Sequence, residues 1–577
     1  MSGSDANRRF VLALAGVLAL AAALRVLFPT ADPPWNAPVG IVWHDEGAWV
    51  HNARNRAIWG AWSLDAWNPM YIAPVFTLLE YLSFAALGVG VWQARLVSVV
   101  AGFASVWLLA LGVRRLGGWT AGIIAGLLLG TNYVYVMYNR AALMETTMAA
   151  FVVAGWYCYV RAQERPWWGV LAGVCALLAF FTKAAAAFFV AAIALDAVLC
   201  WILPRTVSTD AARRASIGVL AGLAAGGLVA LAVFVGPHWA EYQFYNWQMS
   251  VTRKPTYDLR SVMDRVSGFP ILHDVLTRSW LVIVVATIGG LASLARWRTL
   301  VPPERLLLGW LAIGTLELLV HDVGNERRFV FLIPAAVAVA ALVLGGRRAL
   351  AGPELARLTR AQAAVALPVA AYGFYVMAGA VVRVFRLYEI SPNVRLAAGV
   401  ALAATLLLYA FWPRVASWAA TERWSPAAAL AVIGLVSAGD VAQFVQWSMG
   451  RSYKNVAASR LLADCLPPDT LVHGKLANGL ALENRIRPVF VGRNFGNYSD
   501  RTARDDVRYI LTYVAPRIGY EGPVIADVLE AYPERRVVMT FAVAETSTGH
   551  DRAALIDKFG GRQPDGRPGD DMGRACH

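Results

Sequence analysis

Residues 8–28, RRFVLALAGVLALAAALRVLF, decide the fold class of this chain. The run Phe10–Phe28 is apolar, follows the basic pair Arg8-Arg9, and is about long enough to cross a bilayer as a helix. A signal peptide would also begin with basic residues, but no small-residue cleavage site precedes Pro29. We therefore interpret the run as a retained membrane anchor.

The composition of the whole chain agrees with a membrane protein. Its 577 residues are 58% hydrophobic and only 16% charged, with a mean hydropathy of +0.50. These values exclude an ordinary soluble domain and predict a polytopic α-helical protein whose first partner is the lipid bilayer. The net charge of +14 fits the basic loops of such a protein, so we expect no nucleic acid partner.

The apolar stretches predict thirteen transmembrane helices. These are Phe10–Phe28, Leu96–Val113, Trp119–Tyr138, Thr146–Val160, Trp167–Phe181, Ala184–Leu203, Ile217–Gly236, Trp280–Ala295, Leu306–Val320, Phe329–Leu344, Ala363–Val381, Leu396–Trp412 and Ala427–Phe444. Tyr71–Trp92 is also apolar but carries Pro74 and Glu80, and we interpret it as a juxtamembrane helix on the outer face.

The basic residues support this choice. With the N-terminus inside, arginines mark the inner connections, at 114–115, 161, 165, 205, 213–214, 296, 298, 347–348 and 414. Cytoplasmic loops are enriched in Lys and Arg, whereas a further span at Tyr71–Trp92 would put all these clusters outside. The sequence thus predicts a multi-pass protein of the cell (inner) membrane.

The same topology gathers the unusual polar residues on the external face. The segment Ile41–Gly47, IVWHDEG, places Asp45 and Glu46 beyond the first span. The other polar residues at external helix ends lie in Tyr138–Glu145 (YNRAALME), at Lys183, and in Asn325–Phe329 (NERRF). Ionisable groups at a membrane face are costly unless they pair or function, so their convergence predicts one shared site.

The order of these motifs resembles the family 39 glycosyltransferases, which have the GT-C fold and include protein O-mannosyltransferases and the lipid A aminoarabinose transferase. The resemblance rests on Asp45-Glu46, Arg140-x4-Glu145, Thr182-Lys183 and Arg327-Arg328-Phe329 with Pro334, and covers residues 1 to about 450. It implies transfer of a sugar from a polyprenyl-phosphate carrier to an acceptor on the external side. Glu145 stands where family members often have Asp.

The chemistry of the residues suggests roles for them. A carboxylate in a water-poor pocket can deprotonate an acceptor hydroxyl, and we assign this base to Asp45, with Glu46 tuning it or holding a cation. Lys183, Arg327 and Arg328 are candidates to stabilise the departing lipid phosphate. Arg140 would orient Glu145 or Asp45. Tyr138 and Glu326 lie in the same motifs and are assigned to substrate binding.

The sequence requires no cofactor with certainty. His44, Asp45 and Glu46 offer ligand types for a divalent cation, although three adjacent side chains rarely point at one ion. A metal site therefore stays an alternative to a purely ionic site.

The chain divides into three parts. Residues 1–450 form the predicted transmembrane glycosyltransferase domain, with an external loop at 29–95; 451–560 form an external α/β domain; 561–577 are rich in Gly, Pro and Asp and predicted to be disordered. In the α/β domain we expect strands at 470–473, 488–491, 507–513 and 536–541 and helices at 456–464, 524–531 and 553–559. Cys465 and Cys576 fall in this polar part, where the sequence leaves a disulfide between them open.

Two other functions remain open. A transporter or flippase of lipid-linked sugars would also be polytopic and basic, but it tends to have broken helices and internal repeats, neither of which is evident in the sequence. An oligosaccharyltransferase or polymerase would use a whole lipid-linked glycan. The residues identify neither the sugar nor the acceptor, which could be a protein, lipid A or a cell-wall glycan.

Overall fold

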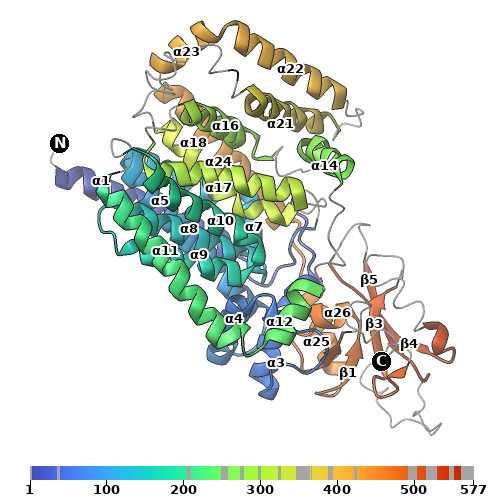
Figure 1. The fold of residues 1–577 in the computed structure, drawn as a ribbon. Helices are drawn as coiled ribbons and strands as arrows, with labels where there is room; N and C mark the ends of the chain where they lie inside the picture. Colours follow the sequence, from blue (N-terminus) through green and yellow to red (C-terminus); the bar gives the residue numbers. More distant parts are fainter. Residues whose placement is uncertain are drawn as a thin grey trace.

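The computed structural model describes residues 3–35, 39–204, 209–248, 258–272, 278–295, 300–321, 326–345, 364, 367–386, 394–421, 425–490, 503–514, 529–544 and 551–560. A bundle of helices makes up most of the molecule, and a small β-sheet lies at one end of it (Figure 1). The main helices are α1 Gly3–Val26, α5 Val91–Gly117, α6 Trp119–Thr131, α7 Tyr133–Asn139, α8 Met144–Ala162, α9 Trp168–Thr182, α10 Ala187–Ile202, α11 Asp210–Ala230, α16 Trp280–Ala295, α17 Pro302–His321, α18 Ile333–Leu344, α21 Leu367–Arg386, α22 Val394–Ala410, α23 Trp412–Thr421 and α24 Pro426–Met449.

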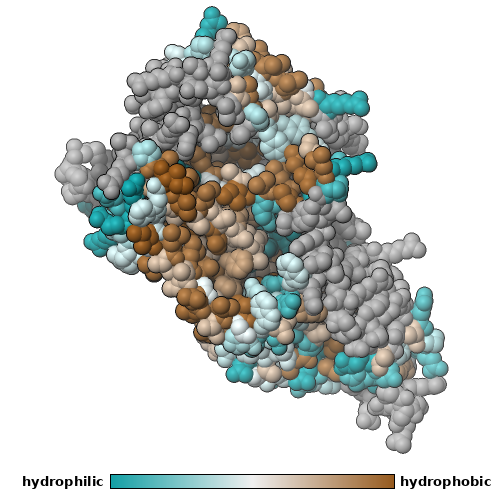
Figure 2. Space-filling view, viewed as in Figure 1, coloured by the Kyte–Doolittle hydropathy of each residue, from teal (hydrophilic) through white to brown (hydrophobic). Residues whose placement is uncertain are grey.

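Each predicted span falls on one or more of these helices, and hydrophobic residues cover much of the face of the bundle that Figure 2 shows. Helices can leave apolar side chains in contact with lipid because their own backbone groups are paired. By length and composition, four described helices can each cross a membrane, or five if the bent pair α6 and α7 counts as one span. Shorter apolar helices match most other predicted spans, so the total of thirteen stays a prediction.

Glycines bring two of these helices close together. A Cβ atom at Gly169 or Gly173 of α9 would lie 2.3 or 2.4 Å from a backbone oxygen of α11, and one at Gly222 of α11 would lie 2.2 Å from the Val170 oxygen. Small residues allow this approach, which is the usual basis of helix packing in lipid.

One predicted span is interrupted. The sequence pattern gave a single helix over Trp119–Tyr138, but α6 and α7 meet at Asn132 with a bend of 63°. Asn132 leaves the helical conformation, and its side chain accepts a hydrogen bond from the Tyr135 N–H, as an N-cap does. Asp440 of α24 accepts the Tyr133 N–H at 3.0 Å. The expectation that the chain has no broken helix was therefore wrong, because capping groups, one of them distant in sequence, satisfy the freed backbone.

Shorter helices lie near the sheet end of the bundle and at the helix junctions. They are α2 His44–Trp49, α3 His51–Trp59, η1 Pro69–Tyr71, α4 Pro74–Leu87, η2 Ala184–Ala186, η3 Leu231–Val235, α12 Trp239–Gln243, η4 Phe244–Gln248, α14 Leu259–Leu272 and η5 Glu326–Phe331. The predicted juxtamembrane helix Tyr71–Trp92 corresponds to α4 and the start of α5.

The C-terminal part holds a five-stranded sheet in the order β2-β1-β3-β5-β4. Its strands are β1 Leu471–His473, β2 Arg487–Val489, β3 Tyr509–Tyr513, β4 Arg536–Ala542 and β5 Arg552–Asp557, and it is accompanied by α25 Lys454–Cys465 and α26 Lys475–Gly479. β1 pairs in parallel with β2 and β3, whereas β5 pairs antiparallel with β3 and β4.

Two helices predicted for the C-terminal part, at 553–559 and 524–531, have different outcomes. The stretch Ala553–Phe559, expected to be helical, is instead mostly strand β5. Pairing on both sides and burial of Ala553 through Asp557 outweigh the local helix propensity. The predicted helix at 524–531 lies mostly outside the described residues, as do Cys576 and the predicted disordered tail.

The segment with the two acids is wedged between the bundle and the sheet. Trp43 is 2% exposed and belongs to the hydrophobic core around α25, α26 and β3. A Cβ atom at Gly47 would lie 1.9 Å from the Asn478 oxygen, so only glycine allows α2 to approach α26 this closely. The segment is therefore packed into the protein interior and is not a solvated loop.

A buried arginine fastens α3 to the same region. Arg54 donates from Nε to Ala481 O and from Nη2 to Asn484 O and Ile486 O, each at 3.0 Å. Burial lowers the pKa of Arg54 to about 9. Hydrogen bonds from a charged group in a dry interior are strong, so these contacts fix α3 on the C-terminal part.

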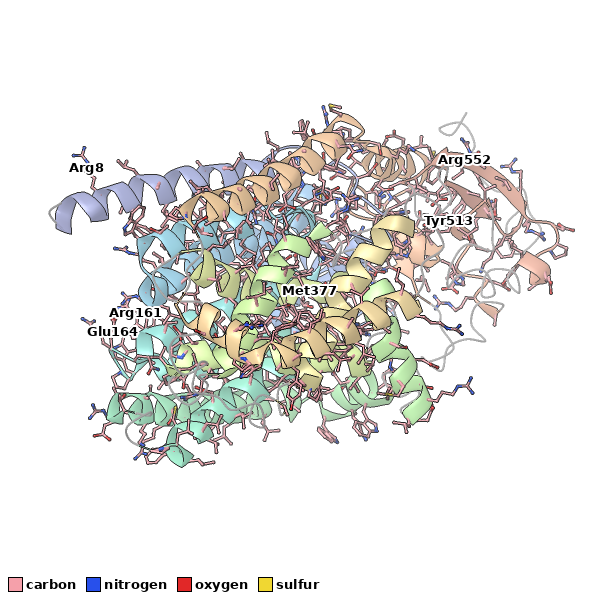
Figure 3. The ribbon with its side chains drawn as sticks, turned by 90° about the horizontal axis from the view of Figure 1, so that it is seen from above. Arg8, Arg161, Glu164, Met377, Tyr513 and Arg552 are labelled. Carbon is pink, nitrogen blue, oxygen red and sulfur yellow. The ribbon has the colours of Figure 1, made fainter. Side chains whose placement is uncertain are left out.

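The two ends of the molecule differ in character. Arg8, Arg161 and Glu164 lie at the end opposite the sheet, whereas Tyr513 and Arg552 lie on the sheet (Figure 3). Arg115 and Glu164 form an ion pair at the first end. The predicted inner arginines at 115 and 161 therefore lie far from the segment that carries Asp45.

Candidate active site

Four predicted site residues meet in one ionic cluster. Arg327 Nη1 lies 2.9 Å from Asp45 Oδ2, and Arg327 Nε lies 3.5 Å from Glu145 Oε1. Lys183 Nζ contacts the same Glu145 oxygen at 2.5 Å. These residues are up to 282 positions apart in the chain. The fold thus brings together four residues that the predicted topology had put on the same face of the membrane.

Local structure prepares three of these side chains. Glu145 lies in the first turn of α8, where the partial positive charge of a helix N-terminus favours a carboxylate. Lys183 is the C-cap of α9, where a helix end favours a cation. Asp45 lies in the first turn of α2, which is held against α26 by the close approach at Gly47. Asp45, Glu145 and Lys183 thus each lie at the end of a helix.

The cluster is closed on one side and open on the other. The Glu145 side chain is 1% exposed and Lys183 is 17% exposed, whereas Asp45 is 14% and Arg327 24% exposed. A ligand can therefore reach the side chains of Asp45, Arg327 and Lys183, whereas the Glu145 side chain is buried beneath them.

Electrostatics bind the cluster together. Burial would lower the pKa of Arg327, but Glu145 and Asp45 outweigh it and raise that pKa above its usual value. Burial lowers the pKa of Lys183, and Arg327 and Arg328 lower it further, whereas Glu145 opposes the change. The two acids and two cations of the cluster balance each other, and Arg328 nearby adds one positive charge in excess, which suits an incoming anion.

Tyr138 and Arg328 lie around the same cluster. Tyr138 is fully buried, donates its hydroxyl to Val39 O at 2.6 Å, and acts electrostatically on Arg327. The charge of Arg328 is felt at Lys183, which places its guanidinium near that ammonium. The Glu326 side chain lies outside the described residues, so its assignment to substrate binding stays a prediction.

Glu46 points elsewhere, although it follows Asp45 directly. Its two oxygens accept two hydrogen bonds from Arg95, at 2.8 and 2.7 Å, and Oε1 also accepts the Ala142 N–H at 2.8 Å. Arg95 donates in addition to Pro29 O and Ala31 O. The carboxylate is thus used to hold α2, α5 and the residues before α8 together.

We expect Glu46→Gln to destabilise the protein strongly. The substitution removes the charge that compensates a buried arginine, and breaking such a pair costs about 3–5 kcal/mol. A large fall in the thermal unfolding midpoint of the purified protein would show this. Glu164→Gln, at an exposed pair with Arg115 (Glu164 side chain 54% exposed), is the matched control and should change the midpoint little. An unchanged midpoint for Glu46→Gln would restore Glu46 as a candidate for direct chemistry.

Arg140 also lies away from the two acids it was expected to orient. It donates to the oxygens of Leu24, Arg25 and Phe28 at 2.8–3.0 Å, at the end of α1, and its guanidinium lies 4.7 Å from the Trp447 ring. A cation at a helix C-terminus satisfies free carbonyl groups. This position gives Arg140 a structural task.

The structure separates the three residues considered for a metal. His44 Nδ1 lies 3.5 Å from the Tyr513 hydroxyl, Asp45 faces Arg327, and Glu46 faces Arg95. Within the described ranges, no group of three His, Cys, Asp or Glu side chains is arranged to hold a metal ion. The donor set at the described site is therefore one of ion pairs.

An apolar cavity of about 560 Å³ adjoins the segment that carries the two arginines. Its wall includes Phe329, Leu332 and Ile333, which follow Arg327-Arg328 directly, and it continues along α16, α17 and α21. Asn132, at the break between α6 and α7, also lines it. The chain thus passes from the two arginines into the cavity wall within a few residues, an arrangement suited to a lipid with an anionic head group.

Sequence reasoning missed several residues that build the site. One of them is Arg95, the partner of Glu46. It is a lone arginine directly before an apolar stretch, and this position could have indicated a buried ion pair. Asp32 accepts hydrogen bonds from the Ser452 hydroxyl and the N–H groups of Lys454 and Asn455, and so ties the loop after α1 to α25. A lone Asp in a loop gives no such signal.

One known protein family matches part of the chain. Residues 71–236, which include Tyr138, Glu145 and Lys183, match the family of dolichyl-phosphate-mannose-protein mannosyltransferases. A search of curated protein sequences gives no match.

Among solved structures, ArnT from Cupriavidus metallidurans in the apo state is similar, with 16% identity and a TM-score of 0.52 over 96% of this chain and 99% of that chain. ArnT bound to undecaprenyl phosphate gives 14% identity and a TM-score of 0.49 over 96% and 98%. The oligosaccharyltransferase AglB from Archaeoglobus fulgidus, with an inhibitory peptide and dolichol phosphate, gives 13% and 0.47 over 94% and 74%. The likeness to apo ArnT shows the fold.

Proposed function

We propose that this membrane protein, whose fold is that of the GT-C glycosyltransferases, transfers a sugar from a polyprenyl-phosphate carrier to an acceptor hydroxyl or phosphate on the external face. The observation that supports it best is the cluster of Asp45, Arg327 and Lys183, from which the segment after Arg327 leads to Phe329 in the wall of the apolar cavity. A lipid-phosphate sugar needs an apolar groove, cations for its phosphate and a base for the acceptor, and the site offers all three.

The proposed reaction uses each group once. The Asp45 carboxylate takes the proton of the acceptor hydroxyl, and the acceptor oxygen forms a bond to the anomeric carbon of the sugar. The bond between that carbon and the phosphate oxygen breaks, and its electron pair leaves with the polyprenyl phosphate. Lys183, Arg327 and Arg328 stabilise the negative charge that develops there.

The ion pair between Asp45 and Arg327 adds a step to this scheme. A carboxylate held by a guanidinium is a weak base, because the pair favours the ionised form. The phosphate of the donor would compete for Arg327 and so release Asp45 for proton transfer. In this scheme the base becomes active only when the donor is bound.

The donor class can be tested with purified protein and two labelled donors, a polyprenyl-phosphate monosaccharide and a polyprenyl-diphosphate oligosaccharide. We expect label from the first to enter an extract of the cell envelope. Transfer of label from the second alone would favour an oligosaccharyltransferase or polymerase instead.

The broken helix gives the transporter alternative one supporting observation. Substrate sites of many transporters lie at such breaks, and Asn132 lines the apolar cavity. The ionic cluster, however, is built at the N-terminus of α8 and the C-terminus of α9, and not at the break itself. Reconstituted protein that moves a lipid-linked sugar across vesicles without transferring it would establish the transporter and refute the enzyme.

The proposed external location of the site gives a labelling prediction. We expect Arg552→Cys, on the exposed side of β5, to react with an impermeant maleimide in intact cells, and Glu164→Cys, at the opposite end, to react only after permeabilisation (Figure 3). Cys158 and Cys200 are buried, and Cys465 is disulfide-bonded, as is usual in an oxidising compartment. The reverse labelling pattern would place the site in the cytoplasm.

A further inference from the structure

A second cavity, of about 240 Å³, lies between α3 and the C-terminal sheet. His51 and Asn55 of α3, Asp65 of the following loop, and Arg487 and Phe490 at β2 contribute to its wall. Typical ligand pockets hold roughly 300–1,000 Å³, so this one has room for a single small unit. None of these residues belongs to the ionic cluster around Asp45.

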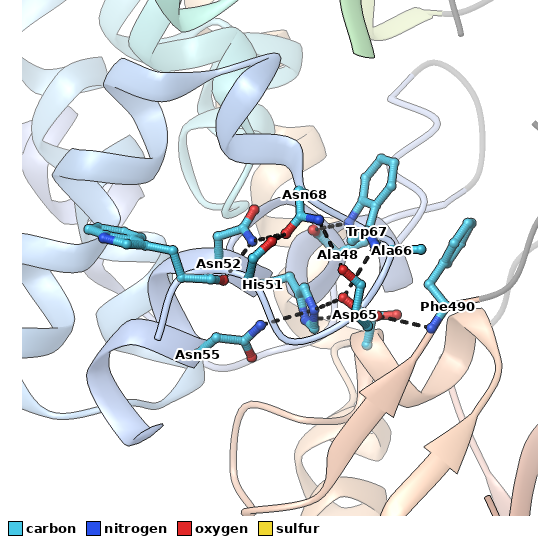
Figure 4. A network of polar contacts seen from close by, with 12 residues as sticks. Ala48, His51, Asn52, Asn55, Asp65, Ala66, Trp67, Asn68 and Phe490 are labelled. Carbon is cyan, nitrogen blue, oxygen red and sulfur yellow. Dashed lines mark hydrogen bonds and ion pairs between the residues drawn. The ribbon is translucent and has the colours of Figure 1, made fainter. Parts of the chain in front are cut away.

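A polar network fixes one side of this cavity (Figure 4). Asp65 Oδ1 lies 2.9 Å from His51 Nε2, and Asp65 Oδ2 accepts the Phe490 N–H at 3.0 Å. His51 Nδ1 lies 3.0 Å from Asn478 Nδ2, so both ring nitrogens have partners. The His51 and Asp65 side chains are therefore preorganised, and the network ties α3 to β2.

Asn55 leaves hydrogen-bonding capacity unused at this wall. Its residue exposure is 1%, its Nδ2 lies 3.1 Å from His51 Nε2, and its Oδ1 meets no partner among the described residues. Turning the carboxamide over would exchange the two atoms and leave the other one unpaired. A buried polar atom without a partner is costly, and a ligand that supplies the missing hydrogen bond would remove the cost.

Arg487 supplies positive charge on the facing side. Its guanidinium carbon lies 5.2 Å from the Trp59 ring, and its Nε is 3.9 Å from Asp469 Oδ1, too far for a hydrogen bond. The Nε atom is buried and has no hydrogen-bond partner among the described residues. Arg504 also lines the cavity, but its fork is occupied by Asp506 at 2.6 Å. Arg487 is thus the cation with capacity for an oxyanion.

We propose that this cavity binds one oxyanion-bearing sugar residue, such as a sugar phosphate or a uronic acid. The guanidinium of Arg487 would take the oxyanion, the Asn55 carboxamide a ring hydroxyl, and the apolar wall at Phe490 a face of the ring. The proposal concerns binding, and it holds whether or not the protein transfers a sugar.

Calorimetry with the purified full-length protein tests the proposal with four probes: glucose 6-phosphate, glucuronate, glucose and inorganic phosphate. We expect glucose 6-phosphate and glucuronate to bind. Glucose lacks the oxyanion and inorganic phosphate lacks the sugar ring, so we expect each of these two to bind at least about tenfold more weakly. Equal binding of phosphate and glucose 6-phosphate would overturn the sugar assignment, and failure of both anionic sugars to bind would overturn the site.

The matched variants are Arg487→Gln and Arg536→Gln, two arginines of the same sheet. Arg536 lies on β4, is exposed, and does not line the cavity. We expect Arg487→Gln to weaken glucose 6-phosphate binding at least about tenfold, since it removes a charge-assisted contact, and Arg536→Gln to leave it unchanged. Thermal unfolding confirms that both variants are folded, and equal affinity in the two would refute the assignment.

Discussion

Asp45→Asn is expected to lower the turnover of sugar transfer by about 10²–10⁴-fold, the usual contribution of a general base, while donor binding stays largely intact. The amide keeps the shape of the side chain and can still accept a hydrogen bond from Arg327 through its oxygen. It cannot take a proton from the acceptor, however, so the loss should appear in kcat and not in donor affinity. Single-turnover transfer and equilibrium binding of a polyprenyl-phosphate sugar measure the two quantities separately.

Asp464→Asn is the matched control for this experiment. Asp464 lies on α25 and is exposed. Its replacement by Asn removes the same charge at a position outside the ionic cluster. Its transfer rate should equal that of the unmodified protein. Near-normal turnover in Asp45→Asn would rule out Asp45 as the base. Glu145 would then be the next candidate, although its 1% exposure leaves an acceptor little access to it.

The sequence predicted the general architecture because hydrophobic patterning is a local property. The apolar runs fall on helices, and basic residues at 115 and 161 lie at the end opposite the sheet. The four residues of the ionic cluster were also found from sequence, because acids and cations that recur at helix ends on the same predicted face indicate a shared site. Their convergence followed from counting spans and needed no knowledge of distances.

The tasks of neighbouring charged residues could not be predicted in the same way. Glu46 is adjacent to Asp45, yet it pairs with Arg95, 49 positions away, and Arg140 serves the end of α1. Adjacent residues on a helix point about 100° apart, so proximity in sequence does not imply a common partner. The break at Asn132 and the strand β5 depend likewise on distant partners, Asp440 in one case and β3 with β4 in the other.

Arg327→Lys is the second substitution for which we expect a large effect, although it keeps the charge. The guanidinium contacts Asp45 through Nη1 at 2.9 Å and approaches Glu145 through Nε at 3.5 Å. A single ammonium cannot occupy both positions, so one carboxylate loses its cation and the donor phosphate loses a fork that can bind two oxygens. Loss of one charge-assisted contact costs about 1.5–3 kcal/mol, or roughly 10–100-fold in transfer.

A double-mutant cycle tests whether Arg327 acts through Asp45. Arg460→Lys, at an exposed pair with Glu483, serves as the control and should transfer at the normal rate. If donor binding to Arg327 is what releases the base, the losses in Asp45→Asn and Arg327→Lys should not add. In Asp45→Asn there is no base left to release, so changing Arg327 as well removes a function that is already lost. Fully additive losses would show that the two residues act independently. An Arg327→Lys protein with the full transfer rate would refute the phosphate role of Arg327 and return that role to Arg328 and Lys183.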